Sequence, residues 1–250
     1  MTPTDTQALA GQTVLITGGA RRLGAAMARA LHAAGANLVI HHRTAAREAA
    51  ALVDALSAQR PGSALALQAD LLDTARLPEL VAAGIARFGR LDILINNAST
   101  FYATPVGEIT AAQFEDLMGT NCRAPLFLAQ AAAAELRRRQ GLILNMVDIH
   151  GMRPLKLYPA YSAAKAALIM LTRSLARELA PQVRVNGIAP GPVLWPADVD
   201  PGMQAQIIDK TLLKRAGDPQ DIAQAALYFA TMAPFVTGQI LAVDGGRSQS

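Results

Sequence analysis

Short apolar runs alternate with helical segments along almost the whole chain. The runs are rich in Val, Ile and Leu, and they span residues 13–17, 37–42, 64–68, 91–95, 142–147, 183–188 and 240–243. Strands that are apolar on both faces are typical of a parallel sheet, because the helices that connect parallel strands cover both of its faces. The pattern therefore predicts an α/β fold, a doubly wound domain with a parallel seven-stranded sheet, helices on both faces, and ligands at the carboxyl ends of the strands.

The segment 190–215 fits this alternation least well. It is interrupted by proline and glycine, carries Trp195, the only tryptophan, and falls between the sixth and seventh runs. Insertions at this end of a sheet are often lids or substrate loops. We therefore expect a single domain, residues 1–250, with a substrate loop or lid around 192–215. Whether Trp195 anchors a lid or forms a pocket wall stays open.

Composition excludes several other classes of protein. No apolar run reaches the ~18 residues that a membrane span needs, and the N-terminus lacks the basic and apolar regions of a signal peptide. The single cysteine, Cys122, cannot form an intrachain disulfide, which suits a reducing cytoplasm. The net charge is +4, but the basic residues are scattered. We therefore expect a cytoplasmic protein with no nucleic-acid or membrane partner, no metal site, and a local positive site for an anionic ligand.

A glycine-rich turn follows the first apolar run. Its sequence is TGGARRLG, residues 17–24, and a helical segment begins within it. Glycines allow the backbone to turn tightly and to approach a pyrophosphate, while the helix N-terminus offers free N–H groups and a partial positive charge. In this strand–turn–helix context the turn predicts a dinucleotide-binding site.

The second run ends in His41, His42, Arg43 and Thr44. A site that prefers NAD places an acidic residue near this point to bind the ribose 2′-hydroxyl. A guanidinium and a hydroxyl suit a 2′-phosphate instead, so the sequence favours NADP(H) over NAD(H). Successive strand residues point to opposite faces, so we expect at most one of the two histidines to meet the cofactor.

Tyr161 and Lys165 lie four residues apart, and Asp148 lies thirteen residues before the tyrosine. Residues at i and i+4 share one face of a helix. An ammonium beside a phenol stabilises the phenolate, so we expect Lys165 to lower the pKa of Tyr161 and to make it a usable acid. The pair alone is weak evidence, because both residue types are also common on solvated helix faces.

Taken together, these motifs resemble those of the short-chain dehydrogenase/reductase family over essentially the whole chain. The matching residues are Thr17, Gly18, Gly24, Asp70, Leu71, Asn96, Asn97, Ala98, Asn121, Tyr161, Lys165, Pro190 and Gly191, in the family's order. The resemblance implies a single Rossmann-type domain, commonly assembled as a homotetramer.

Two departures narrow the resemblance. Arg22 stands where the family usually has a glycine, and Asp148 stands where it usually has the catalytic serine. Both replacements, together with the strings HHRT (41–44) and NNASTFY (96–102), look like the pteridine reductases within that family. An aspartate also argues chemically against a ketone substrate, because an ionised carboxylate only accepts hydrogen bonds and so suits ring N–H and amino groups.

The resemblance implies roles for individual residues. Tyr161 is expected to donate the proton, Lys165 to hold the nicotinamide ribose, Asp148 to relay protons, and Asn121 to steady the proton path or its helix. Phe101 is expected to stack on the pterin. The cofactor-binding candidates are Gly18, Arg22, Leu23, His42, Arg43, Thr44, Asp70, Leu71, Asn97, Ala98, Ser99, Tyr161, Lys165, Pro190 and Gly191, and the substrate-binding candidates are Arg22, Ser99, Phe101, Asp148 and Tyr161.

The expected activity is therefore NADPH-dependent reduction of a pterin by hydride transfer. Dihydrobiopterin, dihydromonapterin and dihydrofolate are the candidate substrates. A carbonyl reductase of the same family, acting on a 3-oxoacyl thioester or a sugar, is the alternative. An NADPH-binding sensor or scaffold without turnover is an alternative of another class. Tyr102 and Tyr158 are further candidates to line the pocket, and a contribution of residues 243–250 to a neighbouring active site stays open.

Overall fold

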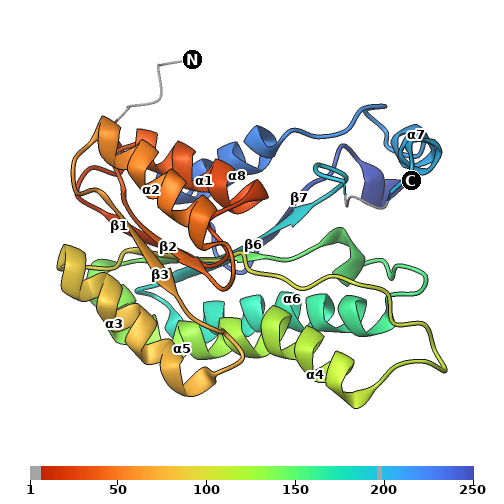
Figure 1. Ribbon diagram of the computed structural model, residues 1–250, viewed down its shortest axis with the longest axis horizontal. Helices are drawn as coiled ribbons and strands as arrows, with labels where there is room; N and C mark the ends of the chain where they lie inside the picture. Colours follow the sequence, from red (N-terminus) through yellow and green to blue (C-terminus); the bar gives the residue numbers. More distant parts are fainter. Residues whose placement is uncertain (1–6, 196–198) are drawn as a thin grey trace.

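The computed structural model describes residues 7–195 and 199–250, and it contains the predicted sheet (Figure 1). One seven-stranded sheet has the order β3-β2-β1-β4-β5-β6-β7, and all neighbouring strands are parallel. The predicted fold class is confirmed. The strands are β1 (Thr13–Ile16), β2 (Asn37–His42), β3 (Ala64–Gln68), β4 (Ile93–Asn96), β5 (Leu142–Met146), β6 (Arg184–Pro190) and β7 (Ile240–Val243).

Helices cover both faces of the sheet (Figure 1). On one face lie α1 (Arg22–Ala33), α2 (Ala46–Gln59) and α8 (Pro219–Thr231). On the other lie α3 (Leu77–Phe88), α4 (Ala111–Met118), α5 (Ala124–Arg139) and α6 (Pro159–Leu179). Each layer buries its own apolar cluster against the strands, around Met27 and Phe229 on the first face and around Leu94 and Leu128 on the second. Burial on both faces explains why the strands are almost continuously apolar.

The segment 192–215 contains a helix of its own. Asp200 caps α7 (Pro201–Asp209) by accepting hydrogen bonds from the Gly202 and Met203 amides at 2.8 and 3.0 Å. A carboxylate at this position satisfies amides that have no partner within the helix. The part of the expected lid at 196–198 lies outside the described residues.

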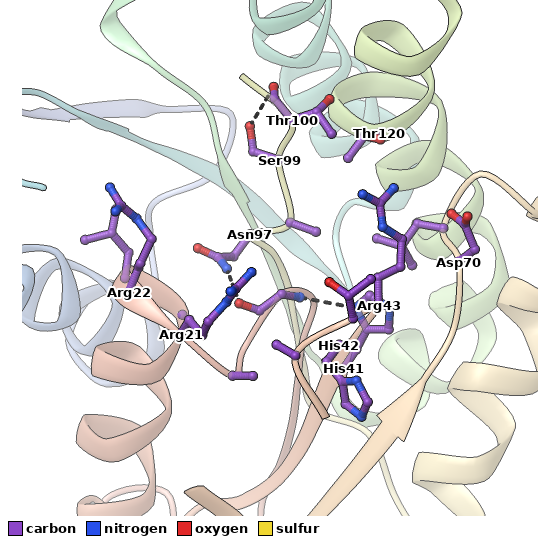
Figure 2. Close-up of a pocket in the computed structure, with 18 residues that line it drawn as sticks. Arg21, Arg22, His41, His42, Arg43, Asp70, Asn97, Ser99, Thr100 and Thr120 are labelled. Carbon is purple, nitrogen blue, oxygen red and sulfur yellow. Dashed lines mark hydrogen bonds between the residues drawn. The ribbon is translucent and has the colours of Figure 1, made fainter. Parts of the chain in front are cut away.

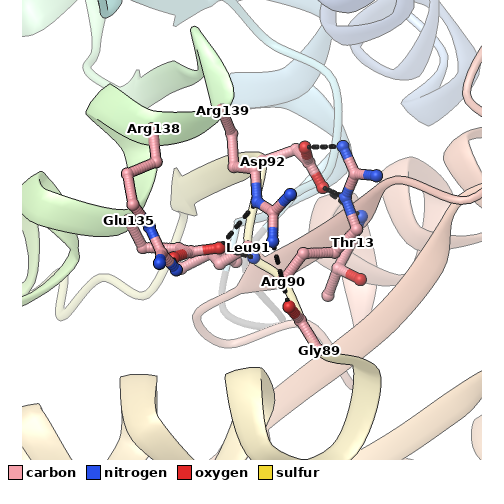
Figure 3. A network of polar contacts seen from close by, with 8 residues as sticks. All are labelled: Thr13, Gly89, Arg90, Leu91, Asp92, Glu135, Arg138 and Arg139. Atoms are coloured by element: carbon pink, nitrogen blue, oxygen red, sulfur yellow. Dashed lines mark hydrogen bonds and ion pairs between the residues drawn. The ribbon is translucent and has the colours of Figure 1, made fainter.

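Two carboxylates are buried at the amino end of the sheet (Figure 3). Asp92, just before β4, accepts the Thr13 amide at 2.8 Å and two guanidinium bonds from Arg90 at 2.8 and 2.6 Å. Glu135, on α5, accepts bonds from Arg138, from Arg139 and from the Leu91 amide. The Asp92 amide donates to the Thr13 carbonyl at 2.9 Å just before β4, which begins at Ile93 and not at the predicted residue 91.

Within residues 7–195 and 199–250, no helix is long and apolar enough to cross a membrane. The same residues form no cluster of three or more His, Cys, Asp or Glu side chains that could hold a metal ion.

Candidate active site

The turn between β1 and α1 lines a pocket at the carboxyl end of the sheet (Figure 2). Gly18 has a φ of 60°, a conformation that glycine adopts readily. A methyl group at Gly24 would overlap the Gly18 carbonyl oxygen, and one at Gly18 would lie 3.0 Å from the Ala98 Cα. No side chain caps α1, so its first amides remain available to an anion. This cradle fits the pyrophosphate of a dinucleotide.

The end of β4 is bound to this turn by four hydrogen bonds. Thr17 Oγ1 accepts from the Asn97 and Ala98 amides at 2.9 and 3.0 Å. Asn97 Nδ2 donates to the Thr17 and Gly18 carbonyls at 2.9 and 3.0 Å. Sequence reasoning assigned Asn97 and Ala98 to the cofactor but gave Thr17 no role of its own. Its hydroxyl connects two of the segments that line the pocket.

The opposite side of the pocket offers donors without protein partners (Figure 2). The Arg43 guanidinium makes no hydrogen bond or ion pair with the residues that the structure describes, and Thr44 lies next to it on the pocket lining. The Nδ1 atom of His42 is buried without a partner. Asp70 and Leu71, at the turn after β3, line the same side. Free cationic and hydroxyl donors fit a phosphate on the ribose, as the sequence predicted.

Both histidines at the end of β2 line the pocket. The expectation that at most one of them meets the cofactor stays a prediction. His41 lies beneath the turn after β1, where both of its ring nitrogens contact backbone atoms. Its Nδ1 accepts the Gly18 amide at 3.1 Å, and its Nε2 lies 3.1 Å from the Ala69 carbonyl oxygen. The signal in the sequence is the first histidine of the HHRT string.

Asp148, Tyr161 and Lys165 come together beyond the end of β5. The Tyr161 hydroxyl donates to Asp148 Oδ2 at 2.7 Å, and the His150 amide donates to Asp148 Oδ1 at 2.8 Å. The second bond holds the carboxylate in place. Lys165 Nζ donates to the Met146 carbonyl at 2.9 Å and lies 5.7 Å from the centroid of the Tyr161 ring. Tyr161 and Lys165 are only 4% and 2% exposed.

The expectation that Lys165 lowers the pKa of Tyr161 is wrong for the protein alone. Burial raises the pKa of Tyr161 well above its usual value, and the charge and hydrogen bond of Asp148 raise it further, whereas the Ser99 hydroxyl lowers it. Lys165 donates to the backbone of β5 and is not among the groups that shift the pKa of Tyr161. Burial lowers the pKa of Lys165 itself to about 8, while Asp148 raises it. Tyr161 is therefore fully protonated at neutral pH.

Asn121 lies in a π-helical turn, Gly119–Arg123, between α4 and α5. Its Nδ2 donates to the Leu117 and Thr100 carbonyls at 2.9 and 3.0 Å, and its Oδ1 accepts the Ser99 hydroxyl at 2.6 Å. A side chain that binds backbone carbonyls stabilises such a widened turn. Asn121 thereby connects the helix to Ser99, which also lines the dinucleotide pocket.

Phe101 forms an aromatic cluster beside Tyr161. Its ring stacks on Tyr158 at 4.6 Å with an interplanar angle of 13°, and it meets Tyr161 edge-on at 4.8 Å. Phe101 is 43% exposed, so part of this apolar ring faces solvent. The Tyr102 ring packs, like Tyr158, against the buried cluster of Leu117, Ala160 and Tyr161. Its hydroxyl donates to Asp116 Oδ2 at 2.9 Å, which fixes the loop to α4.

Two segments approach the site from the carboxyl-terminal part of the chain. Arg22 donates to the Leu194 carbonyl at 3.0 Å and the Trp195 carbonyl at 3.5 Å, which ties the turn before α1 to the start of the segment 192–215. Arg153, five residues after Asp148, donates to the Ser248 and Ser250 carbonyls. In this chain the last residues therefore contact the loop that carries its own Asp148.

The structure gathers most of the cofactor candidates in one pocket. Those that line it are Gly18, Arg22, Leu23, His42, Arg43, Thr44, Asp70, Leu71, Asn97, Ala98 and Ser99. Pro190 ends β6, and Gly191 follows it; neither is among the lining residues of this pocket. Tyr161 and Lys165 lie on α6, outside the lining, and Asn121 connects their surroundings to it through Ser99.

Comparisons with known proteins agree with this arrangement. The family described as enoyl-(acyl carrier protein) reductase matches residues 18–248. The chain is 37% identical to pteridine reductase 1 of Leishmania tarentolae, over 94% of this chain and 95% of that protein. It is 32% identical to the 3-oxoacyl-[acyl-carrier-protein] reductase of Synechocystis sp., over 96% and 98%.

A solved structure is equally similar. The blue fluorescent protein from a metagenomic library, solved in complex with NADPH, superposes with a TM-score of 0.91 at 36% identity and covers 96% of this chain and 99% of that one. The sheet order, the Tyr161–Lys165 pair and these similarities, which extend over nearly the full length, lead to one conclusion. The chain belongs to the short-chain dehydrogenase/reductase family of oxidoreductases.

Proposed function

We propose that the protein reduces pterins with NADPH as the hydride donor. The observation that carries this proposal is the Asp148 carboxylate, 2.7 Å from the hydroxyl of Tyr161, at a position where the family usually has serine. A serine hydroxyl can donate to a carbonyl oxygen, whereas an ionised carboxylate can only accept. Asp148 is therefore suited to a substrate that presents N–H or amino groups.

The cofactor proposal follows from the donors of the pocket. Arg43 and Thr44 offer a guanidinium and a hydroxyl for a 2′-phosphate, the cradle at Gly18 fits a pyrophosphate, and the structural neighbour was solved with NADPH. Pro190, Gly191, Tyr161 and Lys165 remain assigned to the nicotinamide end. A bound NADPH supplies the hydride.

The protein's own residues supply the proton and hold the substrate. Tyr161 carries a proton at neutral pH that it can pass to a ring nitrogen, although burial and Asp148 raise its pKa and make it a weaker acid in the protein alone. Asp148 holds the phenol and accepts from the substrate. Lys165 holds the nicotinamide ribose, and Asn121 keeps Ser99 at the junction of the two sites. The exposed ring of Phe101 offers a flat apolar surface on which a pterin can stack.

NADPH oxidation, followed by absorbance with a panel of oxidised pterins, dihydropterins and dihydrofolate, tests the proposal. We expect turnover on at least one pterin. Asp148→Ser should cut kcat for that pterin by about 100-fold, the range of one positioned acid–base group, and should leave the Kd for NADPH unchanged. Absence of turnover on every pterin would refute the proposal, and equal losses in kcat and NADPH affinity would refute the role of Asp148.

A carbonyl reductase is the second candidate function. The matching family is described as an acyl-carrier-protein reductase, and the Synechocystis relative carries the name of a 3-oxoacyl reductase. Turnover on 3-oxoacyl thioesters or sugars that exceeds turnover on pterins would favour it. NADPH binding without turnover on any of these substrates would instead favour a sensor or scaffold.

The assembly and the lid are further parts of the proposal. We propose a homotetramer in the cytoplasm, with a single domain and a substrate loop at 192–215 that Arg22 anchors at Leu194. Exposed apolar side chains support assembly; they lie on α5, on and just after α8, and on β7, namely Leu126, Phe127, Tyr228, Met232, Phe235 and Leu241. Light scattering after size-exclusion chromatography measures the number of subunits.

A further inference from the structure

His41 is a buried imidazole that joins two walls of the dinucleotide pocket. It lies near the end of β2 and is 2% exposed. Its Nδ1 is 3.1 Å from the Gly18 amide nitrogen, in the turn after β1, and its Nε2 is 3.1 Å from the Ala69 carbonyl oxygen, in the turn after β3. A single ring therefore spans the pyrophosphate side and the adenosine side of the pocket.

The two partners determine the protonation state of this ring. A backbone amide can only donate, so Nδ1 must present its lone pair to Gly18. A carbonyl oxygen can only accept, so Nε2 must carry the proton toward Ala69. An imidazolium would place an N–H against the Gly18 N–H and break the first bond. The geometry thus requires a neutral ring with its proton on Nε2.

The surroundings of His41 favour this neutral form at physiological pH. Burial lowers the pKa of His41 to about 4; the bond to Ala69 and the charge of Asp70 raise it, while His42 lowers it. The ring therefore keeps both bonds throughout the neutral range. The Gly18 amide is also fully used by His41, which leaves the amides at the start of α1 as the donors for a pyrophosphate.

We propose that His41 is a positioning residue for the cofactor, whose neutral ring fixes the Gly18 amide and the turn after β1 relative to the turn at Ala69. This assignment rests on the proposed use of NADPH. Gly18 has no side chain to hold it and has a φ of 60°, so its peptide is free to adopt other conformations when the bond is lost. A turn that is already held in the binding conformation loses less entropy when the cofactor binds.

His32 provides a matched control for His41. Like His41, it is buried, and burial lowers its pKa. Its ring makes one short hydrogen bond, at 2.7 Å, with Ser63 Oγ. His32, however, lies near the end of α1, at the amino end of the sheet, and does not line the pocket. Its replacement tests the loss of a buried histidine without loss of the contact to Gly18.

The experiment compares three variants with the wild type. NADPH binding is measured by the quenching or enhancement of fluorescence during titration. His41→Phe keeps the ring volume without the nitrogens, and we expect its Kd and KM for NADPH to rise about ten-fold, which corresponds to about 1.4 kcal/mol, because the turn is no longer held in the binding conformation. Its kcat at saturating NADPH should stay unchanged. His41→Gln, whose amide offers one acceptor and one donor, should recover most of the affinity, and His32→Phe should bind NADPH as the wild type does.

Several results would overturn the proposal. These are an unchanged Kd in His41→Phe, a fall in kcat that matches the loss of affinity, or an equal loss in His32→Phe. Long-range ¹H–¹⁵N NMR of the wild type should show the Nε2–H tautomer at neutral pH; an imidazolium or an Nδ1–H tautomer would overturn the proposal even if His41→Phe does not fold. A wild type that binds NADPH but reduces no pterin would refute only the pterin proposal, whereas one that does not bind NADPH would refute both.

Discussion

Charged side chains at the amino end of the sheet contact one another, whereas some polar side chains at the carboxyl end lack partners within the described chain. At the amino end, Asp92 accepts three hydrogen bonds and Glu135 accepts bonds from two arginines and a backbone amide (Figure 3). At the carboxyl end, Arg43 has no partner among the described residues, and the buried Nδ1 of His42 has none either (Figure 2). Lys165, with three donor hydrogens, makes one hydrogen bond among these residues.

The pKa values show the same difference. At the amino end, burial alone would raise the pKa of Glu135, but the bonds from Arg139 and Arg138 lower it overall. At the carboxyl end, burial dominates for Lys165 and Tyr161 and makes the charged form of each harder to maintain. A buried polar group without a partner costs about 1–3 kcal/mol. The amino end therefore stabilises the fold, and the carboxyl end keeps polar groups available for ligands at a cost in stability.

The most direct way to test this difference is to remove the Tyr161 hydroxyl. Tyr161→Phe should lower kcat by about 1000-fold, because a positioned general acid contributes about 100- to 10,000-fold. Its free energy of unfolding should change by no more than about 1 kcal/mol, because one hydrogen bond to Asp148 is lost. Steady-state kinetics and urea unfolding measure the two quantities.

Tyr102→Phe is the matched control for that variant. The Tyr102 hydroxyl also donates to a carboxylate, Asp116, at 2.9 Å, but its other hydrogen bond goes to the Gln113 carbonyl, so both partners lie on α4 and neither is Asp148. We expect normal kcat in Tyr102→Phe. A large loss of activity in this variant, or a Tyr161→Phe enzyme that retains activity, would contradict the assignment of Tyr161 as the proton donor.

The opposite test removes a carboxylate from the amino end. Asp92→Ala leaves the Thr13 amide and the Arg90 guanidinium without their partner, and should lower the free energy of unfolding by about 2–3 kcal/mol. The kcat and KM of the folded enzyme should stay normal, because Asp92 lies at the far end of the sheet. Glu79→Ala, which breaks an exposed pair with Arg76, should cost less than about 0.5 kcal/mol. A loss of activity in Asp92→Ala without a loss of stability would contradict the assignment of a stabilising role to the amino end of the sheet.

The fold could be predicted from the sequence because its signal is repeated. Seven apolar runs, each followed by a helix or a turn, leave few alternatives to a parallel sheet, and parallel strands bring the residues that follow them to one edge. This is why Gly18, Arg43 and Asn97, far apart in the sequence, were expected to line one pocket, and why the structure places them there.

The details that failed depend on the direction of single side chains. Lys165 was expected to act on the Tyr161 phenol, but it donates to the Met146 carbonyl, and the burial of both residues decides their pKa values. The Tyr102 hydroxyl donates to Asp116 and to the Gln113 carbonyl, a direction that the sequence does not indicate. The sequence does not assign His41 to the cofactor site. The alternation of side chains along β2 indicates that His41 and His42 point to opposite faces, but it does not show that a loop covers the face on which His41 lies. Sequence spacing carries no information on such rotamers and packing.

Replacement of Arg43, at the carboxyl end of the sheet, should have a smaller effect, which is on the KM for NADPH and not on stability. Arg43→Ala removes a guanidinium without a partner, so its stability should stay unchanged, while its KM for NADPH should rise about ten-fold, as expected for one lost charged hydrogen bond. The KM for NADH should not change. Arg29→Ala, an exposed arginine on α1, alters the net charge equally and should leave both KM values normal. Equal effects of Arg43→Ala on NADPH and NADH would contradict the assignment of Arg43 to the 2′-phosphate.

The pH dependence of the free enzyme gives the smallest effect and the finest test of the comparison. Burial lowers the pKa of Lys165 to about 8, so the ammonium that is assigned to the ribose predominates below this pH and is lost as the pH rises through it. The kcat/KM for NADPH should therefore fall by about half near pH 8 and by about ten-fold per unit above it, because kcat/KM reports the pKa values of the free enzyme. Urea unfolding at each pH separates this decline from loss of the fold, since a lysine with a lowered pKa contributes more stability, not less, as the pH rises from about 8 toward 10. A constant kcat/KM up to about pH 10 would show that Lys165 keeps its proton over this range. The carboxyl end would then have to supply Lys165 with more partners than the single Met146 carbonyl.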